Sequence, residues 1–210
     1  MTRRKVANPL GLAVLALLAE RPMHPYEMAA TLRQRGKEYS IRINYGSLYS
    51  VIAALVRAKF IVTRETSREG ARPVRTVYSL TDAGWAELDD WLPELLRDPV
   101  KEYPQFEAGL SLMPYLPPAQ VEALLDERIR RLDGQSDRLR TEISDAARQG
   151  LDRLFLVEAE YSLAMQEAER NWVAGLKALI RDSPDFTRSW IAYHEHRTKT
   201  KRGGKDAGDS

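Results

Sequence analysis

The stretch NYGSLYSVIAALVRAKFIVT, residues 44–63, decides the fold of the N-terminal half. Apolar residues recur there at every third or fourth position, which predicts an amphipathic helix over residues 45–59. Residues 60–63 and the segment VRTVY at 74–78 are rich in β-branched and aromatic types, with a polar connector between them. We therefore expect this helix to run directly into a β-hairpin.

Helices are also predicted on both sides of this stretch. Residues 9–20 begin with proline and are apolar on nearly every face, as in a helix central to a core. Residues 26–35 form a second amphipathic pattern. After the hairpin, Thr81 is a typical N-cap for a helix that reaches about Arg97. Three helices, a hairpin and a further helix follow the order of a winged helix-turn-helix domain.

The C-terminal half is predicted to be helical as well, so the expected fold class is mostly α. We expect a winged-helix DNA-binding domain over 1–97, a linker rich in proline and aromatic residues over 98–118 with a short helix near 105–113, and a helical domain over 119–197. Residues 198–210, with two glycines and mixed charge, are expected to be a disordered tail.

Two long helical patterns in the helical domain carry narrow apolar stripes on otherwise charged surfaces. Such helices need a partner helix to be stable in water. A homodimer interface would supply one, and a hairpin of both helices within one chain is the alternative. The residues expected at the dimer interface are Val121, Leu125, Leu132 and Leu139 on the first helix and Tyr161, Met165 and Trp172 on the second.

Charge is distributed unevenly along the chain. Residues 1–80 hold 14 Lys and Arg against 5 Asp and Glu, a net charge of +9, whereas the remainder holds 18 against 25, a net charge of −7. This asymmetry indicates a module that binds a polyanion joined to one that avoids it, with chance scatter of surface charge as the alternative. Double-stranded DNA is the partner that a winged helix would bind.

The helix from Tyr45 is expected to enter the major groove, with the hairpin as the wing. Arginine suits this role because its planar fork binds phosphate or guanine and fits a narrow minor groove. Taken singly, each surface arginine could simply be solvated and Tyr49 could be a core residue. The expected DNA-binding residues are Tyr26, Arg42, Asn44, Tyr45, Gly46, Ser47, Tyr49, Ser50, Arg64, Arg68, Arg72 and Arg75.

Several classes of function have no support in the sequence. Cysteine is absent, which excludes thiolate chemistry and disulfides and is typical of a reducing cytoplasm. The basic and apolar start of the chain imitates a secretory signal but continues directly into another amphipathic segment. No phosphate-binding glycine loop, nucleophile elbow or zinc helix is present, and the histidines at 194 and 196 lie on different helix faces. We expect neither an enzyme nor a metal or cofactor site.

Four motifs resemble the PadR family of winged-helix transcriptional regulators. They are LAVLALL at 12–18, HPYEM at 24–28, GSLY at 46–49 and ARPVRTVYSLTDAG at 71–84. The C-terminal half is similar to the longer PadR type through residues 160–161 and 167–172. The resemblance implies a homodimeric repressor whose C-terminal helices swap between subunits, and whose operator binding is weakened by small, often aromatic compounds.

Aromatic residues in and near the linker could line a cavity for such an effector, because their rings provide stacking surfaces for a planar ligand. We expect the effector near Trp91, Phe106 or Trp172, with core packing of these side chains as the alternative. Two rival functions remain at this point. One is a winged helix used for protein contacts and assembly, and the other is a DNA-binding protein without an effector.

Overall fold

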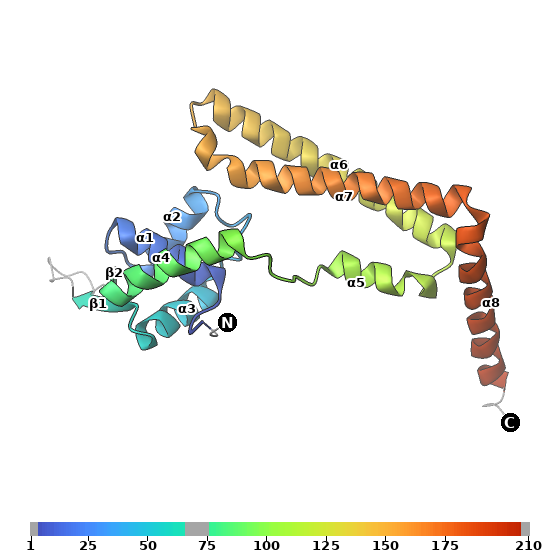
Figure 1. The fold of residues 1–210 in the computed structure, drawn as a ribbon, viewed down its shortest axis with the longest axis horizontal. Helices are drawn as coiled ribbons and strands as arrows, with labels where there is room; N and C mark the ends of the chain where they lie inside the picture. The colour runs from blue at the N-terminus through green and yellow to red at the C-terminus, as the bar shows by residue number, and fades with distance from the viewer. Residues whose placement is uncertain (1–3, 66–75, 207–210) are drawn as a thin grey trace. The chain divides into compact units, whose positions relative to one another are not determined.

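The computed structural model describes residues 4–65 and 76–206 and divides the chain into two compact units, Met1–Lys101 and Glu102–Ser210. Each unit has its own helices (Figure 1). Each also has its own core of buried apolar side chains. Over the described ranges, every helix is too short or too polar to span a bilayer.

The first unit has the predicted winged-helix order. The two strands pair antiparallel from Ile61 opposite Leu80 to Glu65 opposite Thr76, and Met23 adds a bridge to Tyr78 at the base of the hairpin. The expected mostly α fold with a hairpin is therefore confirmed. In chain order the elements are α1 (Pro9–Glu20), α2 (Pro25–Gln34), α3 (Tyr45–Arg57), β1 (Ile61–Glu65), β2 (Thr76–Leu80) and α4 (Asp82–Arg97).

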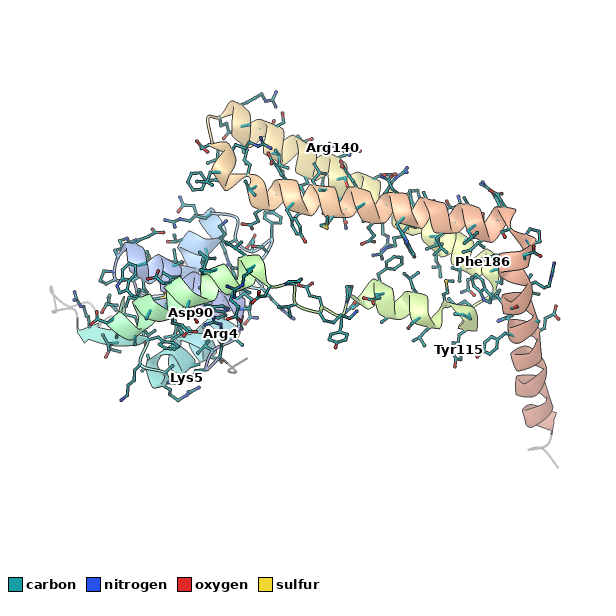
Figure 2. All side chains as sticks on the ribbon, viewed as in Figure 1. Arg4, Lys5, Asp90, Tyr115, Arg140 and Phe186 are labelled. Atoms are coloured by element: carbon teal, nitrogen blue, oxygen red, sulfur yellow. The ribbon has the colours of Figure 1, made fainter. Side chains whose placement is uncertain are left out.

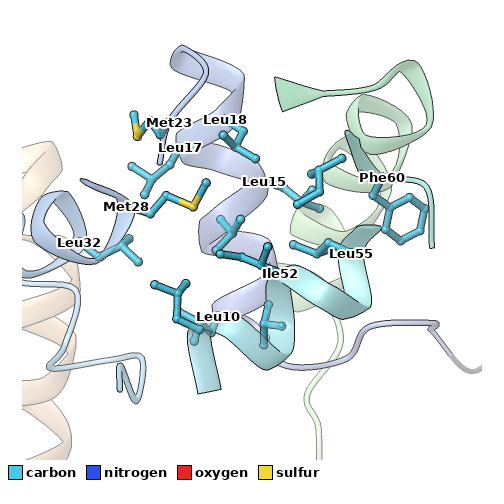
Figure 3. Close-up of a cluster of buried hydrophobic side chains, with 14 of the residues drawn as sticks. Leu10, Leu15, Leu17, Leu18, Met23, Met28, Leu32, Ile52, Leu55 and Phe60 are labelled. Carbon is cyan, nitrogen blue, oxygen red and sulfur yellow. The ribbon is translucent and has the colours of Figure 1, made fainter. Parts of the chain in front are cut away.

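Helix α1 lies at the centre of the first core. Leu10, Val14 and Leu15 on this helix are fully buried, as a helix that is apolar on nearly every face requires. Helix α3 turns Ile52 and Leu55 towards α1 (Figure 3), with α2 and the hairpin closing the remaining sides. The polar side of α3 is thereby held outward on a rigid base.

Short polar side chains fix where α3 and α4 begin. Asn44 caps α3 by accepting a hydrogen bond from the Ser47 amide at 2.7 Å. Thr81 caps α4 by accepting from the Gly84 amide at 3.0 Å, and its hydroxyl donates back to the Phe60 carbonyl at 3.0 Å. Because Phe60 precedes β1, this second bond ties α4 to the base of the hairpin.

The second unit is entirely helical in the described residues. Helices α6 and α7 run antiparallel as a long hairpin, with α8 packed at one end (Figure 1). The elements are α5 (Gln105–Leu112), the 3-10 turn η1 (Met113–Tyr115), α6 (Pro118–Arg148), the 3-10 turn η2 (Arg153–Phe155), α7 (Val157–Asp182) and α8 (Pro184–Asp206).

Helix α8 differs from the expectation. The sequence indicated two long helices and a disordered tail from Thr198, whereas the structure ends α7 at Asp182 and continues as a separate helix to Asp206. Pro184 explains the break, since it cannot donate the amide hydrogen bond that α7 would need but suits the first turn of a new helix.

The stripe on α6 finds its partner within the same chain. Val121 and Leu125 are buried against Val173 and Ile180 of α7 and Trp190 of α8. The Trp190 indole donates a hydrogen bond to the Leu116 carbonyl at 2.8 Å. The alternative of an intrachain hairpin therefore describes this part of α6, because these side chains are already covered.

Candidate nucleic-acid interface

The outer side of α3 presents a run of small and aromatic residues. Tyr45 and Tyr49 are 43% and 52% exposed, and Gly46 and Ser50 lie beside them at the surface. Leu48, on the opposite side, is fully buried. Tyr49 is thus a surface residue, and the predicted face of α3 is the one that the fold leaves open.

Tyr26, Tyr45 and Arg33 form a stack that joins α2 to the start of α3. The two tyrosine rings are nearly parallel, 14° apart in orientation with centroids 6.3 Å apart. The Arg33 guanidinium lies 4.9 Å from the Tyr45 ring centroid, and its Nη1 donates to the Tyr45 hydroxyl at 3.2 Å. This contact fixes the direction of Tyr45 while Tyr26 stays 65% exposed.

Arg33 was not among the predicted site residues. The signal for it was its spacing, since Tyr26 and Arg33 are seven residues apart and so share one face of α2. Glu38 approaches Arg33 only to 3.9 Å, so the closer contact of the Arg33 guanidinium is with Tyr45.

The two serines of α3 direct their hydroxyl hydrogens back to the helix. Ser47 Oγ donates to the Asn44 carbonyl at 3.0 Å, and Ser50 Oγ donates to the Gly46 carbonyl at 2.9 Å. Both hydroxyls can therefore act towards a ligand only as acceptors while these bonds persist.

Part of the positive charge of the first unit is neutralised internally. Arg35 pairs with Glu20 and lowers the pKa of that carboxyl by hydrogen bonding, and Arg21 does the same to Glu27. The net charge of +9 already counts these two carboxylates, but Arg21 and Arg35 are engaged by them and are therefore less available to phosphates. Arg42 and Arg64 are exposed near α3 and on β1, while Arg68, Arg72 and Arg75 lie outside the described residues.

The sequence of the first unit matches a known family. Residues 14–90, which span α1 to the middle of α4, match the model of the transcriptional regulator PadR-like family. The chain carries a PadR-like domain. The exposed face of α2 and α3 described above therefore lies within the PadR-like domain.

Solved PadR structures share the fold over most of the chain. Bacillus subtilis PadR in complex with operator DNA aligns with a TM-score of 0.65 and 18% identity, over 82% of this chain and 99% of that one. The same protein in complex with p-coumaric acid gives 0.62 and 17%, over 84% and 99%. A PadR-like transcriptional regulator from Bacillus cereus gives 0.53 and 16%, over 81% and 94%. A search of curated protein sequences gave no match.

The three aromatic residues expected near an effector belong to two different units. Trp91 belongs to the first unit and is only 3% exposed. Its ring packs near Gly11 of α1, and the Arg4 guanidinium lies 5.5 Å from the ring centroid. The alternative of core packing therefore describes Trp91, and it is removed from the candidate effector residues of this PadR-like chain.

Phe106 and Trp172 do lie together in the second unit. Their rings meet edge to face with centroids 6.3 Å apart, and the Arg128 guanidinium stacks 3.6 Å from the Phe106 centroid. Arg128 is held in turn by a hydrogen bond to Glu169 at 2.6 Å. Trp172 is 54% exposed, so one side of this group is open to a ligand or a partner.

The residues predicted at the dimer interface separate into two sets. Val121, Leu125 and Leu132 on α6 are buried within the chain and cannot also cover a second subunit. Leu139 is partly buried. On α7 a second set remains exposed, comprising Tyr161 at 65%, Met165 at 48% and Trp172 at 54%.

Proposed function

We propose that this PadR-like regulator binds an operator as a homodimer and represses transcription, and that a small aromatic effector releases it. The single observation that carries the DNA-binding part is the outward face of α3, where the Tyr26–Arg33–Tyr45 stack and Tyr49 stand exposed on a PadR-like domain. The similarity of the fold to that of Bacillus subtilis PadR, which was solved in complex with operator DNA, also supports DNA binding.

In this proposal α3 enters the major groove, which is wide enough to admit a helix. Backbone amides at its first turn and the exposed Arg42 and Arg64 contact phosphates and set the register. Arg68, Arg72 and Arg75 on the wing are proposed to contact the backbone or the minor groove. Repression is steric, because a bound dimer blocks polymerase.

The proposed dimer uses the exposed set on α7. Tyr161, Met165 and Trp172 are four and seven residues apart and so share one helix face. Exposed apolar residues gathered on one face are typical of an interaction surface, and a second copy would remove Tyr161 and Met165 from water while the side of Trp172 next to Phe106 stays open. A two-fold dimer implies inverted half-sites about 10 bp apart or a multiple of this.

The proposed effector is a planar aromatic molecule that stacks at Phe106 and Trp172. The open side of Trp172 provides a stacking surface, and the Arg128 guanidinium on Phe106 would favour a ligand with a carboxylate. Bacillus subtilis PadR was solved with p-coumaric acid, which makes this compound the first to try. An effector releases DNA only through a difference in its affinity for the two states.

DNA binding is tested by mapping where the full-length protein binds on the DNA flanking its own gene, then measuring affinity across a salt series. A basic domain that neutralises several phosphates per subunit releases their counterions, so we expect log affinity to fall steeply with log salt. A scrambled duplex of the same composition is the control. A slope near zero, or equal affinity for the scrambled duplex, would refute the proposal.

The effector is tested by tryptophan fluorescence together with operator affinity. We expect an aromatic carboxylate to quench emission and weaken operator binding, with both effects lost in Trp172→Ala. Trp85→Ala, in the other unit, is the matched control and should keep both. Quenching that leaves operator affinity unchanged would remove the effector from the proposal.

A further inference from the structure

The exposed face of α3 has unusual chemistry for a helix that reads DNA. From Tyr45 to Val56 every side chain is aliphatic, aromatic or a hydroxyl, and the first charged residue is Arg57, the last of the helix. Two-pronged recognition of guanine uses arginine or lysine, and that of adenine uses asparagine or glutamine. Helix α3 has none of these types before its final residue.

Two neighbouring residues of those types, Asn44 and Arg33, are already engaged. The Asn44 side-chain oxygen accepts from the Ser47 amide at 2.7 Å, so the acceptor half of an adenine contact is occupied. The Arg33 guanidinium stacks on Tyr45 and donates to its hydroxyl. Neither residue can give a two-pronged base contact without losing a contact that shapes the start of α3.

The serines offer little discrimination either. The Ser47 and Ser50 hydroxyl hydrogens are donated to carbonyls of their own helix turn. The oxygen that remains can accept from cytosine or adenine, and serine is in any case compatible with several bases. Hydrogen bonds from the serines therefore cannot carry most of the sequence preference of this face, and the tyrosine hydroxyls are the remaining groups of α3 that could form such bonds.

One row of the face is apolar and exposed. Tyr45, Tyr49 and Ala53 are spaced four apart, lie on one side of α3 and are all accessible. In the major groove the only apolar base feature is the C5-methyl group of thymine, which aliphatic and aromatic side chains recognise. The exposed row on α3 is therefore suited to contact the C5-methyl group of thymine.

We propose that α3 reads its operator mainly through the C5-methyl groups of thymine, contacted by the row Tyr45, Tyr49 and Ala53. Arg42 before the row and Arg57 after it bind phosphates and set the register. This inference rests on the proposed operator binding and specifies which base is read. Operator half-sites are accordingly centred on thymines.

The experiment begins with the full-length protein and a random pool of duplexes, from which the preferred operator is selected. Each thymine of the selected operator is then replaced by 2′-deoxyuridine, which removes the methyl group and keeps the base pair. We expect about a fourfold loss of affinity for each methyl group that α3 covers, as for burial of one such group. Replacing thymines that lie outside the half-sites should leave the affinity unchanged.

Variants of Tyr49 connect the effect to the row. For each thymine that α3 contacts, we compare the affinity for the operator with the affinity for the duplex that carries deoxyuridine at that position. In Tyr49→Ala the ratio of these two affinities should fall to one at the position that Tyr49 contacts. Tyr49→Phe keeps the ring and should keep the ratio, which makes it the matched control. Replacing guanine with 7-deazaguanine, which removes an acceptor in the groove, should have no effect at positions facing α3.

Two outcomes would overturn the inference. One is an operator that binds equally well with deoxyuridine at every position, and the other is a strong effect of 7-deazaguanine opposite α3. Either would leave operator binding itself intact. Failure to select any duplex from the pool would instead refute the proposed function, so the two failures are distinguishable.

Discussion

Gly46 and Gly84 belong to the same PadR-like domain, but the structure gives them different reasons to lack a side chain. A methyl group on Gly46 would meet only Asn44 Oδ1, at 3.6 Å, so nothing within the chain requires glycine there. A methyl group on Gly84 would lie 2.1 Å from the Phe60 carbonyl oxygen. Gly46 thus leaves free space at the surface of the domain, whereas Gly84 allows α4 to approach the hairpin.

The substitution Gly46→Ala should separate stability from DNA binding. Alanine is favoured over glycine in a helix, so we expect a gain of about 0.5 kcal/mol or less in the free energy of unfolding. Operator affinity should fall about tenfold or more, because the added methyl group separates α3 from the groove and disturbing the contacts to one base pair of a site costs ~1–3 kcal/mol.

Thermal unfolding and operator titration measure the two effects. Gly175→Ala is the matched control, since a methyl group there meets nothing within 4 Å on α7 of the other unit. It should stabilise the chain without altering operator affinity. If Gly46→Ala binds the operator as the native chain does, α3 does not approach DNA at this residue.

Gly84→Ala should destabilise the first unit by about 3 kcal/mol, since overpacking against a backbone carbonyl cannot be relieved by a side-chain rotation. The close approach also positions Thr81, which bonds to the same carbonyl. Chemical denaturation followed by circular dichroism measures the change in the free energy of unfolding. Gly109→Ala on α5, with open space around it, should change stability by less than about 1 kcal/mol, and equal effects of both variants would contradict this explanation.

At the scale of elements, the segment before α1 is fixed to α4 by a single arginine. The Arg4 guanidinium bonds to Glu87 at 2.8 Å, to Asp90 at 3.1 Å and to Glu94, and it lies over Trp91 (Figure 2). Its side chain is only 11% exposed. Burial lowers the pKa of Arg4, but the hydrogen bonds to the three carboxylates outweigh this and raise it above its usual value.

Arg4→Gln should therefore lower the free energy of unfolding by about 2 kcal/mol, because Glu87 is left partly buried without a counter-charge and the contact with Trp91 is lost. The more exposed Asp90 and Glu94 regain water and limit the loss. Lys5→Gln makes the same change of charge at the exposed neighbouring residue and should have little effect. Equal stability of the two variants would show that the hydrogen bonds of Arg4 make no net contribution to the free energy of unfolding.

Helix order was predictable because apolar periodicity, caps and β-branched runs are local signals. Residues 9–20 and the cap at Thr81 illustrate this, since each is recognisable within one or two turns. The break before Pro184 is also a local signal, but reading the apolar stripe only to Leu179 missed α8 and the burial of Trp190. The partner of the α6 stripe was not predictable, because periodicity identifies a buried face and does not say which helix buries it.

The candidate site was predictable to a similar extent. Residue types near the start of α3 indicated the face, and Tyr45 and Tyr49 are exposed on it. The engagement of Arg33 with Tyr45 and the inward bonds of the serines depend on side-chain directions across two helices. Such directions follow from tertiary packing, which no local pattern encodes.

At the scale of the whole molecule, the two cores predict contrasting behaviour of two fragments. Fragment 1–101 keeps the whole core of the first unit and should be folded and soluble. Fragment 1–150 retains α6 but loses α7 and α8, which leaves Val121 and Leu125 uncovered. We expect it to aggregate or to self-associate through this stripe.

Light scattering and circular dichroism distinguish these outcomes. Fragment 1–101 should also bind operator duplex about 10²–10⁴-fold more weakly than the full chain, because the advantage of two linked DNA-binding heads is lost. A soluble, monodisperse fragment 1–150 would contradict the packing described for α6.

The separation of the two cores also bears on how such a regulator can evolve. A substitution in one core leaves the contacts of the other unchanged, and effects of distant mutations add. Substitutions in residues 44–57 can therefore accumulate on the exposed face of α3 without eroding the packing of α6 to α8. Equally, changes beside Phe106 and Trp172 leave the packing of α1 to α4 intact. The two halves of the chain can in this way diversify at separate rates.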